Sequence, residues 1–217
     1  MKDSKDLALD KKNIDIILVL DFGSQYTQLI ARRVRELDVF SEILPWDIST
    51  EKIRNLNPNG IILSGGPDSV TSANTPRIPE VIFELDIPIL GICYGMQTLA
   101  EQFGGQVTAS SSKEFGHATI NLEKTSVLFD GFSSGSSIDV WMSHGDQVST
   151  LPDKFNLVAS TSSAPIAAME HIERPIFALQ FHPEVTHTKQ GNTVIENFAL
   201  KVCNCKPTWK MDNLIEQ

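Results

Sequence analysis

One cysteine stands where the chain favours nucleophilic chemistry. Cys93 follows the apolar segment 87–92 and precedes a helical pattern, and Gly91 and Gly95 flank it two residues away on either side. A nucleophile at such a sharp strand-to-helix turn needs small neighbours at these two positions. The unpaired N–H groups at the start of the helix favour the thiolate form of the side chain. A buried structural cysteine remains the alternative, since free cysteine is among the most buried residue types.

A histidine and a glutamate that could activate this cysteine lie two residues apart. His182 and Glu184 follow the apolar run 176–179, and Pro183 between them favours extended geometry for the residue before it. In an extended chain, residues i and i+2 share a face, so Glu184 can orient one imidazole nitrogen while the other faces the nucleophile. A solvated histidine beside an unrelated acid is one alternative. A metal site completed by His187 is another, but it lacks a further ligand at recognisable spacing.

A glycine pair follows another apolar run. In the segment 63–69 (LSGGPDS) the two glycines allow backbone N–H groups to turn toward a ligand. Gly66 could then donate to an oxyanion opposite the backbone N–H of Tyr94. The same letters fit a phosphate-binding loop, which should lead directly into a helix. Residues 70–76 have no helical periodicity, and Pro67 removes an N–H group, so the phosphate hypothesis is the weaker one.

A fourth segment, 141–148 (WMSHGDQV), is polar, contains glycine and is bounded by apolar residues. This composition suits a ligand-binding loop or a plain turn. Taken alone, the segment does not distinguish between the two.

Apolar runs and helical patterns alternate along the first half of the chain. Continuous apolar runs predict strands that are buried on both faces of a parallel sheet. Strands are expected at 14–20, 41–44, 60–63 and 87–92, and helices at 25–37, 50–56, 79–85 and 95–103. The alternation predicts an α/β fold with an open, mostly parallel central sheet flanked by helices.

The second half changes character and reads as short strands with turns between them. Strands are expected at 108–122, 138–141, 156–160, 166–170 and 175–181, and a last helix at 192–202. We expect these strands to add an antiparallel portion that completes the same single domain.

Composition excludes several classes of protein. The 217 residues include 18 Lys and Arg against 27 Asp and Glu, which gives a formal charge of −9, and 41% are hydrophobic. This is ordinary globular composition, and it does not favour binding to nucleic acid or to an anionic membrane. No run approaches the roughly 18 apolar residues of a membrane span. The odd count of three cysteines, with Cys203 and Cys205 one residue apart, fits reduced thiols and a cytoplasmic location.

Together these segments resemble the class I glutamine amidotransferases, and more narrowly the glutaminase domains of the GMP synthase branch. The matching segments follow in the family's order: 21–28 (DFGSQYTQ), 63–69 (LSGGPDS), 91–97 (GICYGMQ), 142–148 (MSHGDQV) and 180–188 (QFHPEVTHT). G-x-C-x-G-x-Q with a downstream H-P-E is specific to the superfamily. The opening DFGSQYTQLIARRVRE and the WMSHGD segment point to the GMP synthase branch.

The resemblance implies a role for each motif. Cys93 would be the nucleophile, His182 the general base and acid, and Glu184 the group that orients it. Gly66 and Tyr94 would donate the oxyanion N–H groups. The positions that bind the glutamine substrate in this family are occupied in this sequence by Gln97, Ser143, Gly145 and Asp146.

The resemblance also implies partners. The family delivers ammonia to adenylated XMP in an ATP-pyrophosphatase domain, in the same chain or on a separate polypeptide. ATP and Mg²⁺ are expected there, and no cofactor or metal on this chain. We expect a flexible leader (1–13), one amidotransferase domain (14–205) and the start of a linker (206–217). A glutaminase serving anthranilate or carbamoyl phosphate synthesis, and a non-catalytic docking module, remain alternatives.

Overall fold

The apolar runs of the first half form neighbouring parallel strands. The computed structural model describes residues 14–133 and 135–210. In it the strands β1 (Ile16–Asp21), β2 (Phe40–Pro45), β3 (Gly60–Leu63) and β4 (Ile89–Ile92) join with β9 (Ile176–Leu179). Their order in space is β2-β1-β3-β4-β9, and every neighbouring pair is parallel. The carboxyl ends of these strands therefore lie along one edge, where open α/β sheets bind their ligands.

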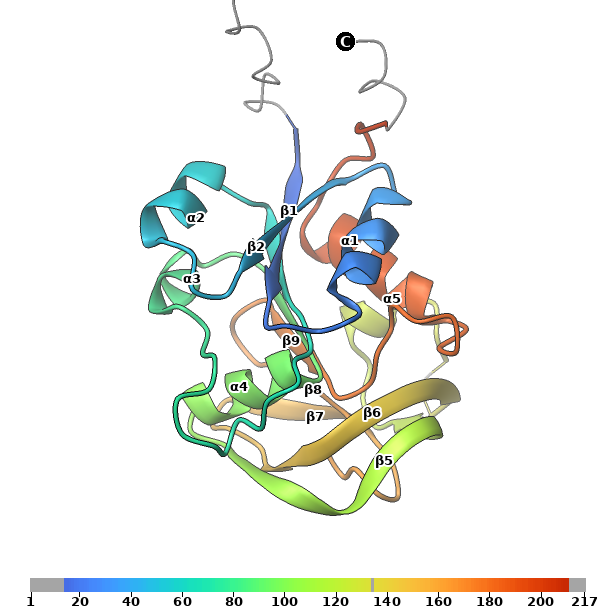
Figure 1. Cartoon of the computed structure of the whole chain (residues 1–217). Helices are drawn as coiled ribbons and strands as arrows, with labels where there is room; N and C mark the ends of the chain where they lie inside the picture. Colours follow the sequence, from blue (N-terminus) through green and yellow to red (C-terminus); the bar gives the residue numbers. More distant parts are fainter. Residues whose placement is uncertain (1–13, 134, 211–217) are drawn as a thin grey trace, which may run out of the picture.

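The second half extends this sheet with antiparallel strands, as expected. These are β5 (Gln106–Leu122), β6 (Ser137–Thr150), β7 (Phe155–Ser160) and β8 (Ala168–His171). The nine-stranded sheet continues from β9 as β8-β7-β5-β6, and each of these pairs is antiparallel. The long β5–β6 pair crosses the end of the molecule at which the parallel strands finish (Figure 1).

Helices cover both faces of the parallel strands (Figure 1). They are α1 (Thr27–Arg35), α2 (Thr50–Leu56), α3 (Glu80–Glu84), α4 (Tyr94–Gln102) and α5 (Gly191–Glu196), with a short 3₁₀ turn at Val127–Phe129. Side chains of β1 alternate between two cores: Ile17 and Val19 pack on the side of α1 and α5, and Leu18 and Leu20 on the side of α2, α3 and α4. Each such fully buried aliphatic side chain contributes about 1.5–3 kcal/mol.

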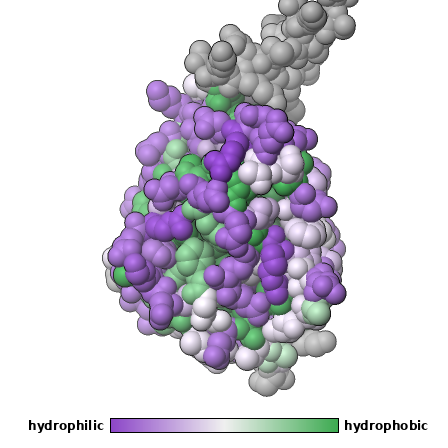
Figure 2. All heavy atoms as spheres, turned by 90° about the vertical axis from the view of Figure 1, so that its left-hand side faces the viewer, coloured by the Kyte–Doolittle hydropathy of each residue, from purple (hydrophilic) through white to green (hydrophobic). Residues whose placement is uncertain are grey.

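The outer surface over α2 and α3 is mainly polar. With that side turned toward the viewer, hydrophilic side chains cover most of the face, and apolar side chains are visible between them (Figure 2). In the described residues, no helix is both long and apolar enough to cross a membrane.

Two expected elements differ from the structure. The segment 141–148 is not a loop or a turn, because β6 runs through it to Thr150. The last helix is α-helical only as far as Glu196 and continues as a π-helix over Asn197–Val202. The remaining expected strands and helices are present, with ends that move by a few residues.

The proposed leader 1–13 and residues 211–217 of the proposed linker lie outside the described residues. Residues 206–210 are described and pack on the domain. Trp209 is buried against Phe40, with ring centroids 5.8 Å apart. The backbone N–H of Trp209 donates to the Asp38 carbonyl over 2.8 Å. All three cysteines are free thiols.

Candidate active site

Cys93 occupies a strained turn between β4 and α4. Its φ of 52° and ψ of −104° lie in a region that a non-glycine residue rarely adopts and that costs on the order of 1–3 kcal/mol. Hydrogen bonds on both sides hold it there: the Cys93 N–H donates to Leu179 O over 2.7 Å, and the Gln97 N–H donates to Cys93 O over 3.1 Å. This geometry presents the sulfur at the carboxyl edge of the sheet.

The glycines on either side are required by packing, as the sequence predicts. A Cβ on Gly91 would lie 2.8 Å from the carbonyl group of Gly95, and a Cβ on Gly95 would lie 2.5 Å from Leu63 O. The Gly95 N–H also donates to Ser64 O over 3.0 Å. The nucleophile turn is thereby joined to the glycine loop that follows β3.

His182 and Glu184 form a buried pair beside the sulfur. The Nδ1 atom of His182 lies 2.7 Å from Glu184 Oε1, and the two side chains are 4% and 1% exposed. Because a carboxylate only accepts, the proton of the neutral ring lies on Nδ1 and Nε2 is free to act as a base. Burial favours the neutral ring, but the Glu184 charge and the contact with the Cys93 sulfur outweigh it and raise the pKa of His182 well above 6.5.

The backbone of this pair is held by β6, by α1 and by the loop that follows Glu184. The His182 N–H donates to Trp141 O on β6 over 3.0 Å, and Thr188 Oγ1 donates to His182 O over 2.7 Å. From α1, Arg33 Nε donates to Glu184 O over 3.0 Å. The ring of Tyr26, the residue before α1, packs edge-on against the imidazole, with centroids 5.2 Å apart. The sequence predicts the pair but not this support.

The glycine loop after β3 has no room for side chains. A Cβ on Gly65 would lie 3.3 Å from His182 Cε1, and one on Gly66 would lie 2.8 Å from Phe22 O. The Tyr94 hydroxyl donates to Pro76 O over 2.6 Å, and burial raises the pKa of this tyrosine. A Cβ on Gly66 would also lie 3.3 Å from Cγ of the Tyr94 ring, and both residues line the same pocket as Cys93. Their role as oxyanion donors stays a prediction.

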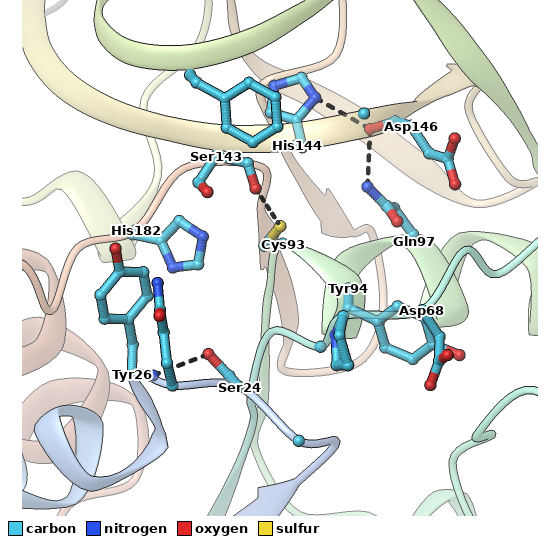
Figure 3. Close-up of a pocket in the computed structure, with 16 residues that line it drawn as sticks. Ser24, Tyr26, Asp68, Cys93, Tyr94, Gln97, Ser143, His144, Asp146 and His182 are labelled. Carbon is cyan, nitrogen blue, oxygen red and sulfur yellow. Dashed lines mark hydrogen bonds between the residues drawn. The ribbon is translucent and has the colours of Figure 1, made fainter.

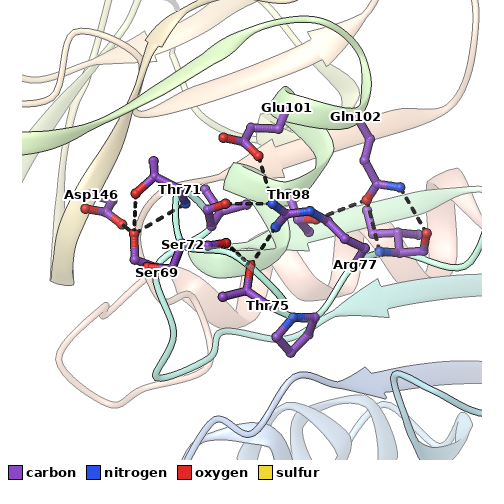
Figure 4. A network of polar contacts seen from close by, with 12 residues as sticks. Ser69, Thr71, Ser72, Thr75, Arg77, Thr98, Glu101, Gln102 and Asp146 are labelled. Carbon is purple, nitrogen blue, oxygen red and sulfur yellow. Dashed lines mark hydrogen bonds and ion pairs between the residues drawn. The ribbon is translucent and has the colours of Figure 1, made fainter.

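The rest of this loop is anchored to α4 (Figure 4). Arg77 donates to Val70 O over 2.7 Å and pairs with Glu101 at 3.1 Å. Gln102 holds both backbone groups of Ile78, accepting from its N–H over 2.9 Å and donating to its carbonyl over 3.0 Å. Residues 70–79 contain no helix, which removes the basis for a phosphate loop.

Four consecutive residues of β6 line the site: Ser143, His144, Gly145 and Asp146. Figure 3 labels Ser143, His144 and Asp146. Cys93 Sγ lies 3.6 Å from Ser143 O. The Asp146 carbonyl accepts from Gln97 Nε2 over 2.8 Å and from His144 Nδ1 over 3.0 Å, so both of its lone pairs are used. The Asp146 carboxylate in turn accepts a hydrogen bond from Ser69 of the glycine loop.

These parts enclose a pocket of about 430 Å³. Eight of the nine predicted site residues line it: Gly66, Cys93, Tyr94, Gln97, Ser143, Gly145, Asp146 and His182. Glu184 is the ninth: it does not line the pocket and contacts His182 at Nδ1. Figure 3 shows the side chains of Cys93 and His182 on one side of this pocket and Asp146 on another.

The metal alternative does not agree with the geometry. His187 is turned away from the pair and packs against Trp141, with ring centroids 4.3 Å apart. Across the described residues, no group of three or more His, Cys, Asp or Glu side chains is arranged to hold a metal ion.

Four pocket residues from the segment 23–26, together with Asp68, Phe115 and His144, carry no role in the sequence-based prediction. His144 is the most constrained: its Nε2 lies 3.0 Å from Glu114, and its side chain is 1% exposed. Burial lowers the pKa of His144, although the Glu114 carboxylate opposes this. The match of the segment 21–28 to the family could have indicated the pocket residues 23–26. For His144, the sequence signal is the alternation of apolar residues at Ile138, Val140 and Met142. These side chains are buried on one face of β6, and His144 is the next position on that face.

Comparison with protein families identifies one model. The family described as "Glutamine amidotransferase class-I" matches residues 18–202. Among curated relatives, GMP synthase [glutamine-hydrolyzing] of Histophilus somni is 53% identical over 205 residues, and that of Pasteurella multocida is 55% identical over 205 residues. Both matches cover 92% of this chain but only 39% of the relative, so the chain spans about two fifths of their length.

Solved structures give the same fold. A putative GMP synthase subunit from Thermoplasma acidophilum is 33% identical with a TM-score of 0.76, and the match covers 94% of this chain and 98% of that one. A glutamine amidotransferase from Thermotoga maritima is 20% identical with a TM-score of 0.64, and the match covers 89% of this chain and 86% of that one. The second match is evidence of the fold alone.

Proposed function

Because the chain belongs to the class I glutamine amidotransferases, we propose that it hydrolyses the side-chain amide of L-glutamine and supplies the ammonia for the amination of XMP to GMP. The observation that carries the proposal is the position of Cys93 on its strained turn, beside the buried His182–Glu184 pair and inside one pocket. Nucleophile, base and orienting group are the parts that covalent acyl transfer needs.

The first half of the reaction forms a thioester. The Cys93 proton moves to His182 Nε2, and the thiolate attacks the carboxamide carbon of glutamine. The resulting oxyanion accepts hydrogen bonds from the backbone N–H groups of Gly66 and Tyr94; one such donor is typically worth about 100- to 1,000-fold in rate. His182 then returns its proton to the departing nitrogen as the C–N bond breaks, and ammonia leaves.

The second half returns the enzyme to its starting state. His182 takes a proton from a water molecule, whose oxygen attacks the thioester carbon. A second oxyanion forms in the same position and collapses with cleavage of the C–S bond, which leaves the product as a carboxylic acid and Cys93 as a thiolate. His182 returns its proton to the Cys93 sulfur, and the new carboxyl group loses its proton to water as glutamate leaves. Glu184 holds the ring so that Nε2 faces the reacting atoms in both halves.

The acceptor of the ammonia belongs to a partner. The glutamine-hydrolysing GMP synthases of Histophilus somni and Pasteurella multocida are longer than this chain, and the Thermoplasma acidophilum protein is described as one subunit of a GMP synthase. We therefore propose an ATP-pyrophosphatase domain as the partner, in the same polypeptide or on a separate one, with ATP and Mg²⁺ bound there.

Glutamate release from glutamine tests the proposal. Wild type and Cys93→Ala are compared alone and with a GMP synthase pyrophosphatase domain, ATP and XMP. The expected result is glutamate release that rises with the partner and is lost in Cys93→Ala. No glutamate from folded wild-type protein under either condition would contradict the enzymatic function and favour a docking module. If an anthranilate or carbamoyl phosphate synthetase stimulates glutamate release and the GMP synthase domain does not, the ammonia has a different acceptor from XMP.

A further inference from the structure

Gln180 is a buried amide to which the proposed mechanism gives no role. It directly follows β9, and its exposed fraction is 0%. Its Nε2 lies 3.8 Å from Cys93 Sγ, and its Oε1 lies 3.5 Å from Gln97 Nε2. A side-chain amide fully removed from water needs partners for these groups, and in this site one partner is the reacting sulfur.

The direction of this amide follows from its neighbours. The Asp146 carbonyl can only accept, so the Gln97 atom that lies 2.8 Å from it must be the donating Nε2. The second hydrogen of this Nε2 requires an acceptor, which makes the facing atom of Gln180 its oxygen. A flipped Gln180 would set two NH₂ groups against each other. The Asp146 carbonyl orients the Gln97 amide, and the Gln97 amide orients that of Gln180. As a result, the N–H group of Gln180 Nε2 faces the Cys93 sulfur.

The value of this donor depends on the charge of the sulfur. In the thiol form, Cys93 can donate its own proton to Ser143 O, 3.6 Å away. Once the proton has moved to His182, the sulfur can only accept, and the Ser143 carbonyl becomes a repulsive neighbour. The N–H of Gln180 then makes a charge-assisted bond that is stronger than the bond to the neutral thiol.

We propose that Gln180 is a further catalytic residue of the glutaminase reaction: its Nε2 donates a hydrogen bond to the Cys93 thiolate and stabilises it until it attacks the substrate. The inference rests on the proposed function and adds one contact to it. Because Asp146 belongs to the segment proposed to bind glutamine, the chain Asp146–Gln97–Gln180 also connects the substrate site with the nucleophile.

Two variants separate the donor from the shape of the side chain. Gln180→Glu keeps the shape and the acceptor for Gln97 but replaces the donor with a carboxylate, and Gln180→Met removes both polar groups. The measurement is the rate of Cys93 alkylation by iodoacetamide against pH, followed on the Cys93 peptide by mass spectrometry. We expect the midpoint of the profile to move up by about one pH unit in Gln180→Met and further in Gln180→Glu. The kcat for glutamate release should fall about tenfold in Gln180→Met.

Gln102→Met is the matched control. It removes three hydrogen bonds of a glutamine on α4, to Thr98 and to both backbone groups of Ile78, without touching the sulfur. We expect it to lower the melting temperature but to leave the alkylation midpoint unchanged. An unchanged midpoint in the folded Gln180 variants, or an equal shift in Gln102→Met, would overturn the inference.

A measurement on the wild type keeps the inference testable if both Gln180 variants unfold. The side-chain amide signals of Gln180 in a ¹⁵N NMR titration should change with the same midpoint as Cys93 alkylation, and signals that do not respond would overturn the inference. The two failures are distinguishable. If wild type releases glutamate but the alkylation midpoints of the Gln180 variants do not move, only the role of Gln180 is contradicted. If wild type releases no glutamate, the proposed function is contradicted, and the alkylation profiles still report whether Gln180 contacts the Cys93 sulfur.

Discussion

The Nδ1 atom of His182 lies 2.7 Å from Glu184 Oε1, and both side chains are almost completely buried. A carboxylate in this position would be unfavourable without a partner, since burying a charge requires a compensating one. The charge is compensated when the imidazole is protonated, which is the state formed when Cys93 loses its proton. The pair thus favours the ion-pair form of the nucleophile and its base.

Replacing Glu184 with Gln should impair the reaction without abolishing it. The amide preserves the size of the side chain but removes the charge that stabilises the imidazolium, whereas Cys93→Ala removes the nucleophile. We expect kcat for glutamate release to fall about 100-fold in Glu184→Gln, within the range that general acid–base catalysis supplies, and to be undetectable in Cys93→Ala. Steady-state kinetics of both variants check this order. Equal loss of activity in two folded variants would show that Glu184 does more than orient and stabilise.

The stability of the protein should also depend on pH through His182. Its pKa is raised well above 6.5 in the folded protein. The folded state therefore binds the proton more tightly than the unfolded state, and this contribution is complete below about pH 6.5 and is lost as the pH rises through the folded value. The difference in free energy of unfolding between wild type and His182→Gln should be larger at about pH 6 than at about pH 9. Urea titrations at the two pH values measure it, and a difference that grows with pH would contradict a raised pKa of His182.

Much of the fold and site could be predicted because the signals are local. Continuous apolar runs such as 60–63 predict buried strands, and the spacing of Gly91, Cys93 and Gly95 predicts the turn. The extent of β6 could not be predicted in this way. His144 and Gly145 have the composition of a turn. His144 pairs with Glu114 and Asp146 with Ala109 of β5, and Gly145 lies at the irregularity of the ladder between them, so the strand depends on long-range pairing that no local pattern reports. The role of Gln180 depends on residues about 35 and 85 positions away, which no local pattern reports.

A methyl group at Gly95 should destabilise the protein, whereas one at Gly145 should not. The Cβ of Gly95→Ala would lie 2.5 Å from Leu63 O and 2.7 Å from Leu63 Cβ, and because the nearest atom is backbone of a buried strand, it has little room to adjust. We expect a loss of about 1–3 kcal/mol in the free energy of unfolding, measured by urea denaturation. Gly145→Ala meets no atom within 4 Å and should unfold like wild type, while narrowing the pocket and raising KM for glutamine. Equal stability of the two variants would contradict the packing argument.

Breaking the His144 contact should affect substrate binding more than chemistry. His144 Nδ1 supplies one of the two hydrogen bonds to the Asp146 carbonyl, and because a carbonyl only accepts, Nδ1 is the donor. In His144→Phe the ring remains but the donor is lost, which costs about 1–3 kcal/mol for a buried group. We expect KM for glutamine to rise about tenfold, with a smaller change in kcat. A loss confined to kcat would place His144 in the chemical step instead.

The Asp146 carboxylate should recognise the positive charge of the substrate. Asp68 and Asp146 are the acidic residues of the pocket, and Asp146 is held by Ser69 through its carboxylate and by Gln97 and His144 through its carbonyl. A hydrogen bond to a charged group contributes about 1.5–3 kcal/mol, so Asp146→Asn should raise KM for glutamine about 10- to 100-fold with little change in kcat. Asp139→Asn is the matched control, because Asp139 lies on the same strand but is 53% exposed and outside the pocket. Since the contact is electrostatic, glutamine analogues without the α-amino group should be affected much less by Asp146→Asn. Equal discrimination by wild type and variant would assign the amino group to another residue.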